Sequence, residues 1–162
     1  MADKTGQTHH KQGAAMRDIE HSLPMQLLRA REAAMARFRP MLRGHGLTEQ
    51  QWRVIRVLAA AQSIDATELA RRSFLLAPSL TRILQFLEAR NLVQREADSR
   101  DQRRSVLKLT PAGWEVFGAV APDSERLYAN IEREFGQGKL QKLYDLLADF
   151  TGAIASDSRP TE

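Results

Sequence analysis

The sequence predicts a mainly α-helical domain that carries one small β-hairpin. Apolar residues recur at helical spacing in several stretches between residues 22 and 156, which is typical of amphipathic helices. Two short runs, 92–97 and 105–110, flank a densely charged segment and are typical of paired strands. A chain of 162 residues is long enough for one domain to bury a core without disulfides, and it contains no cysteine.

The first twenty residues are rich in Gly, Gln, Thr, Lys and His and lack any apolar period, so 1–20 is expected to be a flexible tail. His9 and His10 lie there without further ligands, and adjacent histidines of this kind are more often solvated than bound to metal. No metal site and no cofactor is therefore predicted. A single domain is expected over 21–156, with a polar tail over 157–162.

The first helix is expected over 22–43, and Gly44 and Gly46 end it. Its apolar side chains follow helical spacing: Leu27, Leu28, Ala34, Met35, Phe38 and Leu42. The run LTEQQW then predicts a second helix start, with Thr48 as N-cap, Gln51 as its capping-box partner, and Leu47 and Trp52 in the staple positions. This helix is expected to reach about Ala61.

A short third helix is expected from the sequence DATE, in which Asp65 caps the backbone amides and Glu68 returns a bond, and it ends near Ser73. Pro78 lies in the first turn of a fourth helix, where its missing N–H has no partner to lose. The inner face of this helix is apolar: Leu80, Ile83, Leu84 and Leu87. Asn91 suits its C-terminal end.

A fifth helix is expected to begin with Thr110 as cap and Pro111 at its first position, and to run to Phe135. Pro122 removes one backbone donor and is expected to kink or interrupt it. After a break at the sequence GQG, 136–138, the last helix shows a seam with heptad-like spacing: Leu140, Leu143, Leu147, Phe150 and Ile154.

Two short helices followed by a hairpin with a basic tip have the order of a winged helix-turn-helix. The outer face of the fourth helix carries small and hydrogen-bonding groups that fit a DNA major groove: Pro78, Ser79, Thr81, Arg82 and Gln85. The chain has 24 basic and 20 acidic residues, a net charge of +4, which permits a polyanionic partner without requiring one. Double-stranded DNA is therefore the expected partner.

The tip of the hairpin is predicted to be a DNA-binding wing. Arg100, Arg103 and Arg104 can reach phosphates or a minor groove, where negative potential attracts guanidinium groups. Asp101 is expected to pair with an arginine and fix its direction. A solvated charged turn is the simpler alternative for such a run.

The segment DQRRSVLKLT resembles the wing of the MarR family of bacterial transcriptional regulators, an Asp-x-Arg motif followed by a strand that ends in Leu-Thr. The segment REAAMARFRPMLRGHGLTEQQWRVIRVL is similar to the subgroup that controls homoprotocatechuate degradation operons. The resemblance covers about 22–156. It implies a homodimer joined by 22–43 and 111–156, whose winged lobes, 47–110, grip a pseudo-palindromic operator. It also implies that Arg103 enters the minor groove and that Asp101 orients it.

The terminal helices support dimerisation independently, because a small winged lobe offers little surface to cover their apolar seams. A two-fold dimer that places its fourth helices in successive major grooves needs them roughly 34 Å apart. The resemblance further implies a ligand-responsive repressor that a small aromatic or phenolic acid releases from DNA. Arg31, His45 and Trp52 could supply a cation and an apolar wall, although a surface ion pair, a loop residue and a core staple are their simpler readings.

A winged-helix module that binds protein instead of DNA remains the alternative, although Phe86 is its only exposed anchor candidate on the fourth helix. No nucleophile, metal-ligand or paired-carboxylate spacing predicts an enzyme. No apolar stretch approaches the ~20 residues that span a bilayer, and the N-terminus lacks the apolar region of a secretory signal. A cytoplasmic protein without membrane contact is expected.

Overall fold

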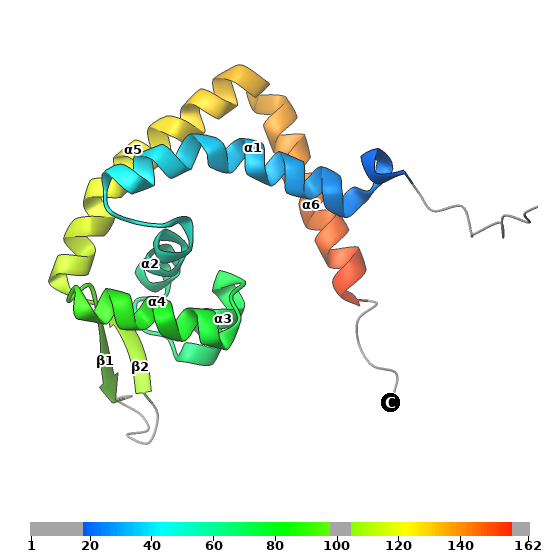
Figure 1. Cartoon of the computed structure of the whole chain (residues 1–162). Helices are drawn as coiled ribbons and strands as arrows, with labels where there is room; N and C mark the ends of the chain where they lie inside the picture. Colours follow the sequence, from blue (N-terminus) through cyan, green and yellow to red (C-terminus); the bar gives the residue numbers. More distant parts are fainter. Residues whose placement is uncertain (1–17, 98–104, 157–162) are drawn as a thin grey trace, which may run out of the picture. The chain divides into compact units, whose positions relative to one another are not determined.

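The computed structural model describes residues 18–97 and 105–156, so predictions that fall on 1–17, 98–104 and 157–162 lie outside the described residues. The elements follow one another along the chain as drawn in Figure 1: η1 (Ile19–His21), α1 (Leu23–Gly44), α2 (Glu49–Ala61), α3 (Ala66–Ser73), α4 (Ala77–Ala89), β1 (Val93–Ala97), β2 (Ser105–Leu109), α5 (Pro111–Phe135) and α6 (Gln137–Ser156). The expected order of helices and hairpin is confirmed.

The chain divides into two units, and the boundary between Ala36 and Arg37 falls within α1. In the first unit, the Asp18 side chain caps η1 by accepting a hydrogen bond from the Glu20 amide. The Arg29 guanidinium lies 3.1 Å from the Glu20 carboxylate, which ties α1 to η1. The regular structure therefore begins just before the predicted first helix.

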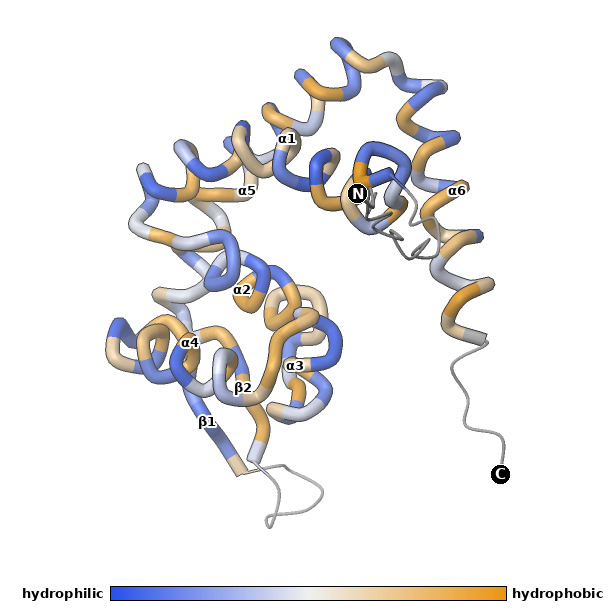
Figure 2. Tube along the Cα trace, turned by 45° about the vertical axis from the view of Figure 1, so that its right-hand side comes forward, coloured by the Kyte–Doolittle hydropathy of each residue, from blue (hydrophilic) through white to orange (hydrophobic). Residues whose placement is uncertain are grey.

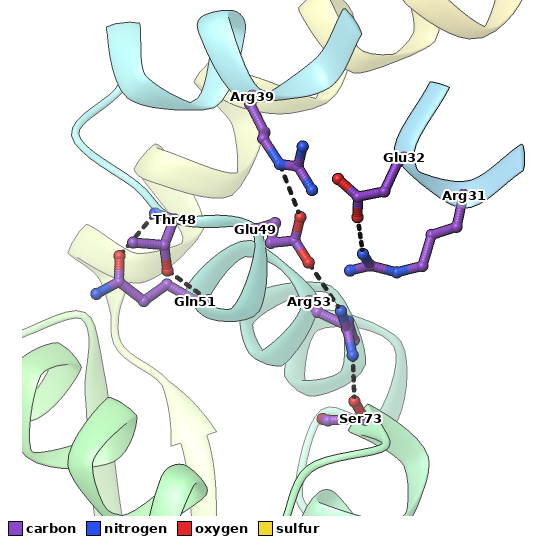
Figure 3. Close-up of polar contacts among 8 residues, drawn as sticks. All are labelled: Arg31, Glu32, Arg39, Thr48, Glu49, Gln51, Arg53 and Ser73. Atoms are coloured by element: carbon purple, nitrogen blue, oxygen red, sulfur yellow. Dashed lines mark hydrogen bonds and ion pairs between the residues drawn. The ribbon is translucent and has the colours of Figure 1, made fainter. Parts of the chain in front are cut away.

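The second unit holds the winged helix-turn-helix. Its core consists of apolar side chains from α2, α3, α4, the two strands and α5, of which Val54, Ile55, Leu58, Leu69, Leu84, Leu87 and Val120 are fully or almost fully buried. The start of α2 has the predicted capping box: the Thr48 Oγ1 accepts from the Gln51 amide at 3.2 Å, and the Gln51 side chain accepts from the Thr48 amide at 2.9 Å (Figure 3).

The start of α3 has one half of its expected capping box. The Asp65 carboxylate accepts from the Glu68 amide at 2.9 Å, as predicted. The Glu68 carboxylate bonds instead to Arg71 and to Arg72, at 2.5 Å and 2.7 Å. Two cations three and four residues further along the helix attract this carboxylate more strongly than one neutral amide does.

The hairpin pairs β1 with β2 in antiparallel register, with Val93 opposite Leu109 and Ala97 opposite Ser105. Ile64 adds an isolated bridge to this ladder, because its amide and carbonyl exchange hydrogen bonds with Leu107 at 3.2 Å and 2.8 Å. The sequence reading did not find this bridge. Ile64 thereby fixes the segment between α2 and α3 to the base of the hairpin.

The junction from α4 through the hairpin to α5 is held by Thr110, which is 2% exposed. Its hydroxyl donates to the Asn91 carbonyl at 2.6 Å and accepts from the Gly113 amide at 3.0 Å, which gives α5 its predicted N-cap. Asn91 itself has a φ of 55°, which suits its predicted position at the end of α4.

Helix α5 is continuous from Pro111 to Phe135, so of the two outcomes predicted for Pro122, a kink or an interruption, the interruption does not occur. The ribbon of α5 changes direction along its length, in keeping with the predicted kink (Figure 1). A proline can be accommodated within a long helix at the cost of one backbone hydrogen bond and a bend. The predicted break after Phe135 is confirmed, with Gly136 at a φ of 96°.

Helix α6 shows apolar and polar stretches alternating along its length in Figure 2. From residue 141 to residue 155 all of its residues are exposed in the isolated chain. The predicted seam residues Leu143, Leu147, Phe150 and Ile154 are among the exposed large apolar side chains. A helix with so little cover within its own chain is typical of an oligomer interface.

Candidate DNA-binding surface

Helix α4 presents the predicted recognition face to solvent. Leu80, Ile83, Leu84 and Leu87 are buried, and they pack α4 against α2, α3 and β1. Pro78, Thr81, Arg82 and Gln85 are exposed, and Ser79 is half-buried. The predicted buried and exposed faces of α4 are therefore confirmed, whereas contact of the exposed face with DNA stays a prediction.

Two side chains of the outer face differ in what they can offer. The Thr81 hydroxyl donates to the Ala77 carbonyl at 2.9 Å, so Thr81 presents its methyl group and oxygen lone pairs to a partner. Among the described residues, Arg82 has no hydrogen-bond or ion-pair partner, so all of its donors are available. A guanidinium of this kind can donate two hydrogen bonds to a guanine.

The stem of the hairpin is stiffened by ion pairs. The Arg95 Nε of β1 lies 2.7 Å from the Glu88 carboxylate of α4, and the Lys108 Nζ of β2 lies 2.6 Å from the Glu96 carboxylate of β1. The Lys108 ammonium holds the pKa of Glu96 below its usual range. These contacts couple the direction of the strands to α4. The predicted wing residues Arg100, Asp101, Arg103 and Arg104 lie beyond them, outside the described residues.

The three predicted effector residues are engaged within the protein. Trp52 is 6% exposed and stacks on Phe117 with a 5.7 Å centroid separation, so it serves as a core residue. The His45 Nε2 lies 2.9 Å from the Asp123 carboxylate, and this contact together with Arg126 lowers the pKa of Asp123. Arg31 belongs to the first unit, where it bonds to Glu32 at 2.7 Å (Figure 3).

A different cluster in the second unit offers a cation beside aromatic rings. The Arg56 guanidinium donates to the Tyr128 hydroxyl at 3.2 Å and lies 6.0 Å from the centroid of the same ring. The rings of Tyr128 and Phe38 are tilted against each other at 4.9 Å. The sequence reading missed this cluster, because its members come from α1, α2 and α5 and share no local motif.

A charged network lies beside the start of α2. The Glu49 carboxylate bonds to Arg39 at 3.2 Å and to Arg53 at 3.5 Å, and Arg53 also donates to the Ser73 carbonyl at 3.0 Å (Figure 3). A hollow of about 470 Å³ adjoins it, lined by Arg39, Leu42, Arg43, Leu47, Thr48, Glu49 and Gln50. Because the Glu49 carboxylate offsets the positive charge of these arginines, we infer that the network stabilises the packing of α1, α2 and α3 and does not bind a ligand.

Within the described residues, no group of His, Asp or Glu side chains could hold a metal ion. None of the helices that these residues form is both long and apolar enough to cross a membrane.

A helix-turn-helix with an exposed polar face on α4, followed by an antiparallel hairpin, is typical of the class of DNA-binding transcriptional regulators. Comparison with known proteins agrees, since the sequence profile of the MarR family matches residues 45–104. The homoprotocatechuate degradative operon repressor of Escherichia coli is 44% identical over 132 residues, covering 82% of this chain and 89% of that protein. The regulator FarR of Neisseria gonorrhoeae is 43% identical over 128 residues, covering 79% and 88%.

The fold has close relatives among solved structures. The crystal structure of NadR in complex with 4-hydroxyphenylacetate superposes with a TM-score of 0.73 at 40% identity, covering 85% of this chain and 97% of that one. The chain belongs to the MarR family, and it is a transcriptional regulator that binds double-stranded DNA as a homodimer. The alternative of a protein-binding module without DNA binding is not favoured.

Proposed function

We propose that the chain is a repressor that a small phenolic acid releases from a pseudo-palindromic operator. The observation that carries this proposal is the exposed polar face of α4 beside a stem of paired strands, in a chain 44% identical to an operon repressor. The related NadR was crystallised with 4-hydroxyphenylacetate, which makes a phenolic acid the effector class to test first. The protein would act in the cytoplasm, where its DNA lies, and would have no catalytic activity.

We propose a division of labour along the chain. Residues 22–43 and 111–156 would form the dimer region, and residues 47–110 the DNA-binding lobe. Within that lobe, Pro78, Ser79, Thr81, Arg82 and Gln85 would read the major groove. Arg100, Arg103 and Arg104 would form the wing, with Asp101 orienting Arg103 in the minor groove. The ion pair between Glu88 and Arg95 supports this assignment, because it would hold the wing in a fixed direction relative to α4.

The carboxylate of the effector would be bound by a basic side chain that does not already face a carboxylate of the protein. Arg56 meets this condition better than His45, because Arg56 bonds to the neutral Tyr128 hydroxyl whereas His45 faces the Asp123 carboxylate. The rings of Tyr128 and Phe38 could form an apolar wall for a phenol. The assignment of Arg31, His45 and Trp52 to an effector site stays a prediction from the sequence.

A gel-shift titration of the protein against its own upstream DNA, with and without 4-hydroxyphenylacetate, tests the proposal. We expect a sequence-specific shift that the acid weakens.

Arg82→Ala should cost ~1 to 3 kcal/mol of binding free energy at the operator and leave binding to random DNA nearly unchanged. Arg103→Ala should weaken binding and reduce its salt dependence. A protein that binds operator and random DNA equally would contradict the proposal.

The effector site is tested by the same titration with two variants compared side by side. If Arg56 binds the carboxylate, Arg56→Ala should still shift the operator but no longer respond to 4-hydroxyphenylacetate, while Arg31→Ala responds normally. The reverse result would move the carboxylate site to Arg31. A normal response in both variants would rule out both assignments.

A further inference from the structure

The turn between α3 and α4 exposes two large apolar side chains. Phe74 is 88% exposed and Leu76 is 79% exposed, which makes them the most exposed large apolar residues of the described chain. We refer to Phe74 and Leu76 as the apolar turn. Leu75, which lies between them, is half-buried, and its amide donates to the Ala70 carbonyl at 3.0 Å, so the backbone of the turn is fixed.

Both residues of the apolar turn are poor local choices for the isolated fold. Phe74 has φ 50° and ψ 49°, a left-handed conformation that glycine or asparagine adopts at lower cost. Leu76 is the N-cap of α4 and makes no side-chain capping bond, where a serine or an aspartate would stabilise the helix. Residues that break local rules without a compensating contact point to a role outside the fold.

The surroundings of the apolar turn suit DNA better than an apolar protein surface. Arg71 and Arg72 precede it on α3, where they share the Glu68 carboxylate. Arg82 follows on α4 and has no partner among the described residues. The turn is also continuous with the N-terminal end of α4, and in helix-turn-helix proteins this end of the recognition helix contacts base edges.

We propose that the apolar turn reads thymine, with the Leu76 side chain packing against the C5-methyl group of a thymine in the major groove. This inference rests on the proposed function and adds a specificity contact to it. The methyl group is the one apolar feature that the major groove presents, and it distinguishes thymine from cytosine. The costs of an uncapped helix and an exposed leucine are then offset only when the operator is bound.

The test replaces thymines of the footprinted operator with uracils, one position at a time. Uracil keeps every pairing and groove acceptor of thymine and lacks only the methyl group. For the unaltered protein, we expect about fourfold weaker binding at one thymine of each half-site, the change in affinity expected for one buried methyl group. For Leu76→Ala, the same uracil should change the affinity by less than about 1.5-fold, since the two losses report one contact.

Leu76→Ser is the matched control, because it removes the apolar group but supplies a capping hydroxyl. It should melt at a higher temperature than the unaltered protein and still show no uracil penalty. This result would show that the penalty disappears because the apolar contact of Leu76 is lost, and not because the start of α4 is destabilised. Leu76→Met should keep the uracil penalty.

Two results would overturn the inference while leaving the proposed function intact. One is specific operator binding by the unaltered protein with no uracil penalty at any thymine. The other is a uracil penalty of equal size in Leu76→Ala and the unaltered protein. Absence of any operator-specific binding by the unaltered protein would instead refute the proposed function itself.

Discussion

Phe74 combines two features that oppose the stability of the fold. Its backbone is left-handed and its ring is 88% exposed, so the ring contributes little to the core while the Cβ atom strains the turn. We expect Phe74→Gly to raise the free energy of unfolding by ~1 kcal/mol, measured by urea denaturation.

The matched control is Phe74→Ala, which also removes the ring but keeps the Cβ atom in the same conformation. It should leave the stability of the protein close to its original value. If Phe74→Ala stabilises the protein as much as Phe74→Gly does, exposure of the ring and not the backbone is the source of the cost.

Residue-level predictions from the sequence mostly succeeded where the physical cause is local, and the exception is Glu68, which pairs with Arg71 and Arg72 and does not complete its capping box. Thr48 and Gln51 form their capping box because both partners lie within one turn of helix. Thr110 was expected as a cap for the same reason, but its bond to Asn91 depends on two elements meeting. Arg56 and Tyr128 are 72 residues apart, and nothing in either segment alone indicates that they touch.

At the scale of elements, the start of α5 depends on a close approach that only glycine allows. A Cβ atom on Gly113 would lie 2.1 Å from the Leu92 carbonyl oxygen, which belongs to the backbone and cannot move aside. We expect Gly113→Ala to lower the free energy of unfolding by about 3 kcal/mol, at the upper end of typical overpacking costs. Urea denaturation followed by circular dichroism measures this change.

Gly118 in the same helix provides the control. A Cβ atom there meets no atom within 4 Å, so Gly118→Ala should stabilise α5 by up to ~1 kcal/mol through helix propensity alone. Equal effects of the two substitutions would mean that α5 does not pack closely on the hairpin base in solution.

Helix α3 contains a charge cluster that responds to acid. Hydrogen bonds from Arg71, and then from Arg72, lower the pKa of Glu68 from 4.5 to about 2. Because the folded-state pKa is the lower one, Glu68 contributes stability above about pH 4.5 that is lost as the pH falls towards 2. Glu68→Gln should therefore show a smaller drop in melting temperature between pH 5 and pH 2, in ~0.1 M salt.

Glu115→Gln is the comparison for this effect, since Glu115 is exposed on α5 and has no ion pair within the described residues. Its melting curves should follow those of the unaltered protein across the acid range. A Glu68→Gln variant that loses stability in acid as steeply as the unaltered protein would show that the cluster is not formed in solution.

The elements themselves were largely predictable, because helical periodicity and capping motifs act over a few residues. Some departures from the prediction have specific causes. Of the two outcomes expected at Pro122, a kink or an interruption, the interruption does not occur, and α5 stays continuous between the buried residues Val120 and Ser124. The bridge of Ile64 to Leu107 was missed because a single paired residue has no periodicity to detect.

For the whole molecule, the exposed apolar side chains of α6 make the isolated chain an incomplete unit. Leu146 and Ile154 are 66% and 55% exposed, and residues 141–155 have no buried position. A homodimer covers such surfaces, and folding then becomes coupled to association. The melting temperature should therefore rise with protein concentration.

Leu147 lies on the seam shared by Leu143, Phe150 and Ile154, so a charge at this position should disrupt the dimer. We expect Leu147→Asp to sediment as a monomer at micromolar concentration. Its affinity for a complete operator should fall by more than 100-fold, because one lobe alone loses the contribution of the second half-site. Its affinity for a single half-site should change little if the lobe folds without the dimer region.

Asp149→Ala tests whether the position on the helix matters, because residue 149 lies on the opposite side of α6 from the seam and is also exposed. This variant should remain dimeric and bind the operator normally. A dimeric Leu147→Asp protein with unchanged operator affinity would show that α6 contributes little to the dimer interface. A surface other than the second copy of the chain would then have to cover the apolar seam of α6. Loss of both dimer and half-site binding in Leu147→Asp would instead mean that the winged lobe folds only within the dimer.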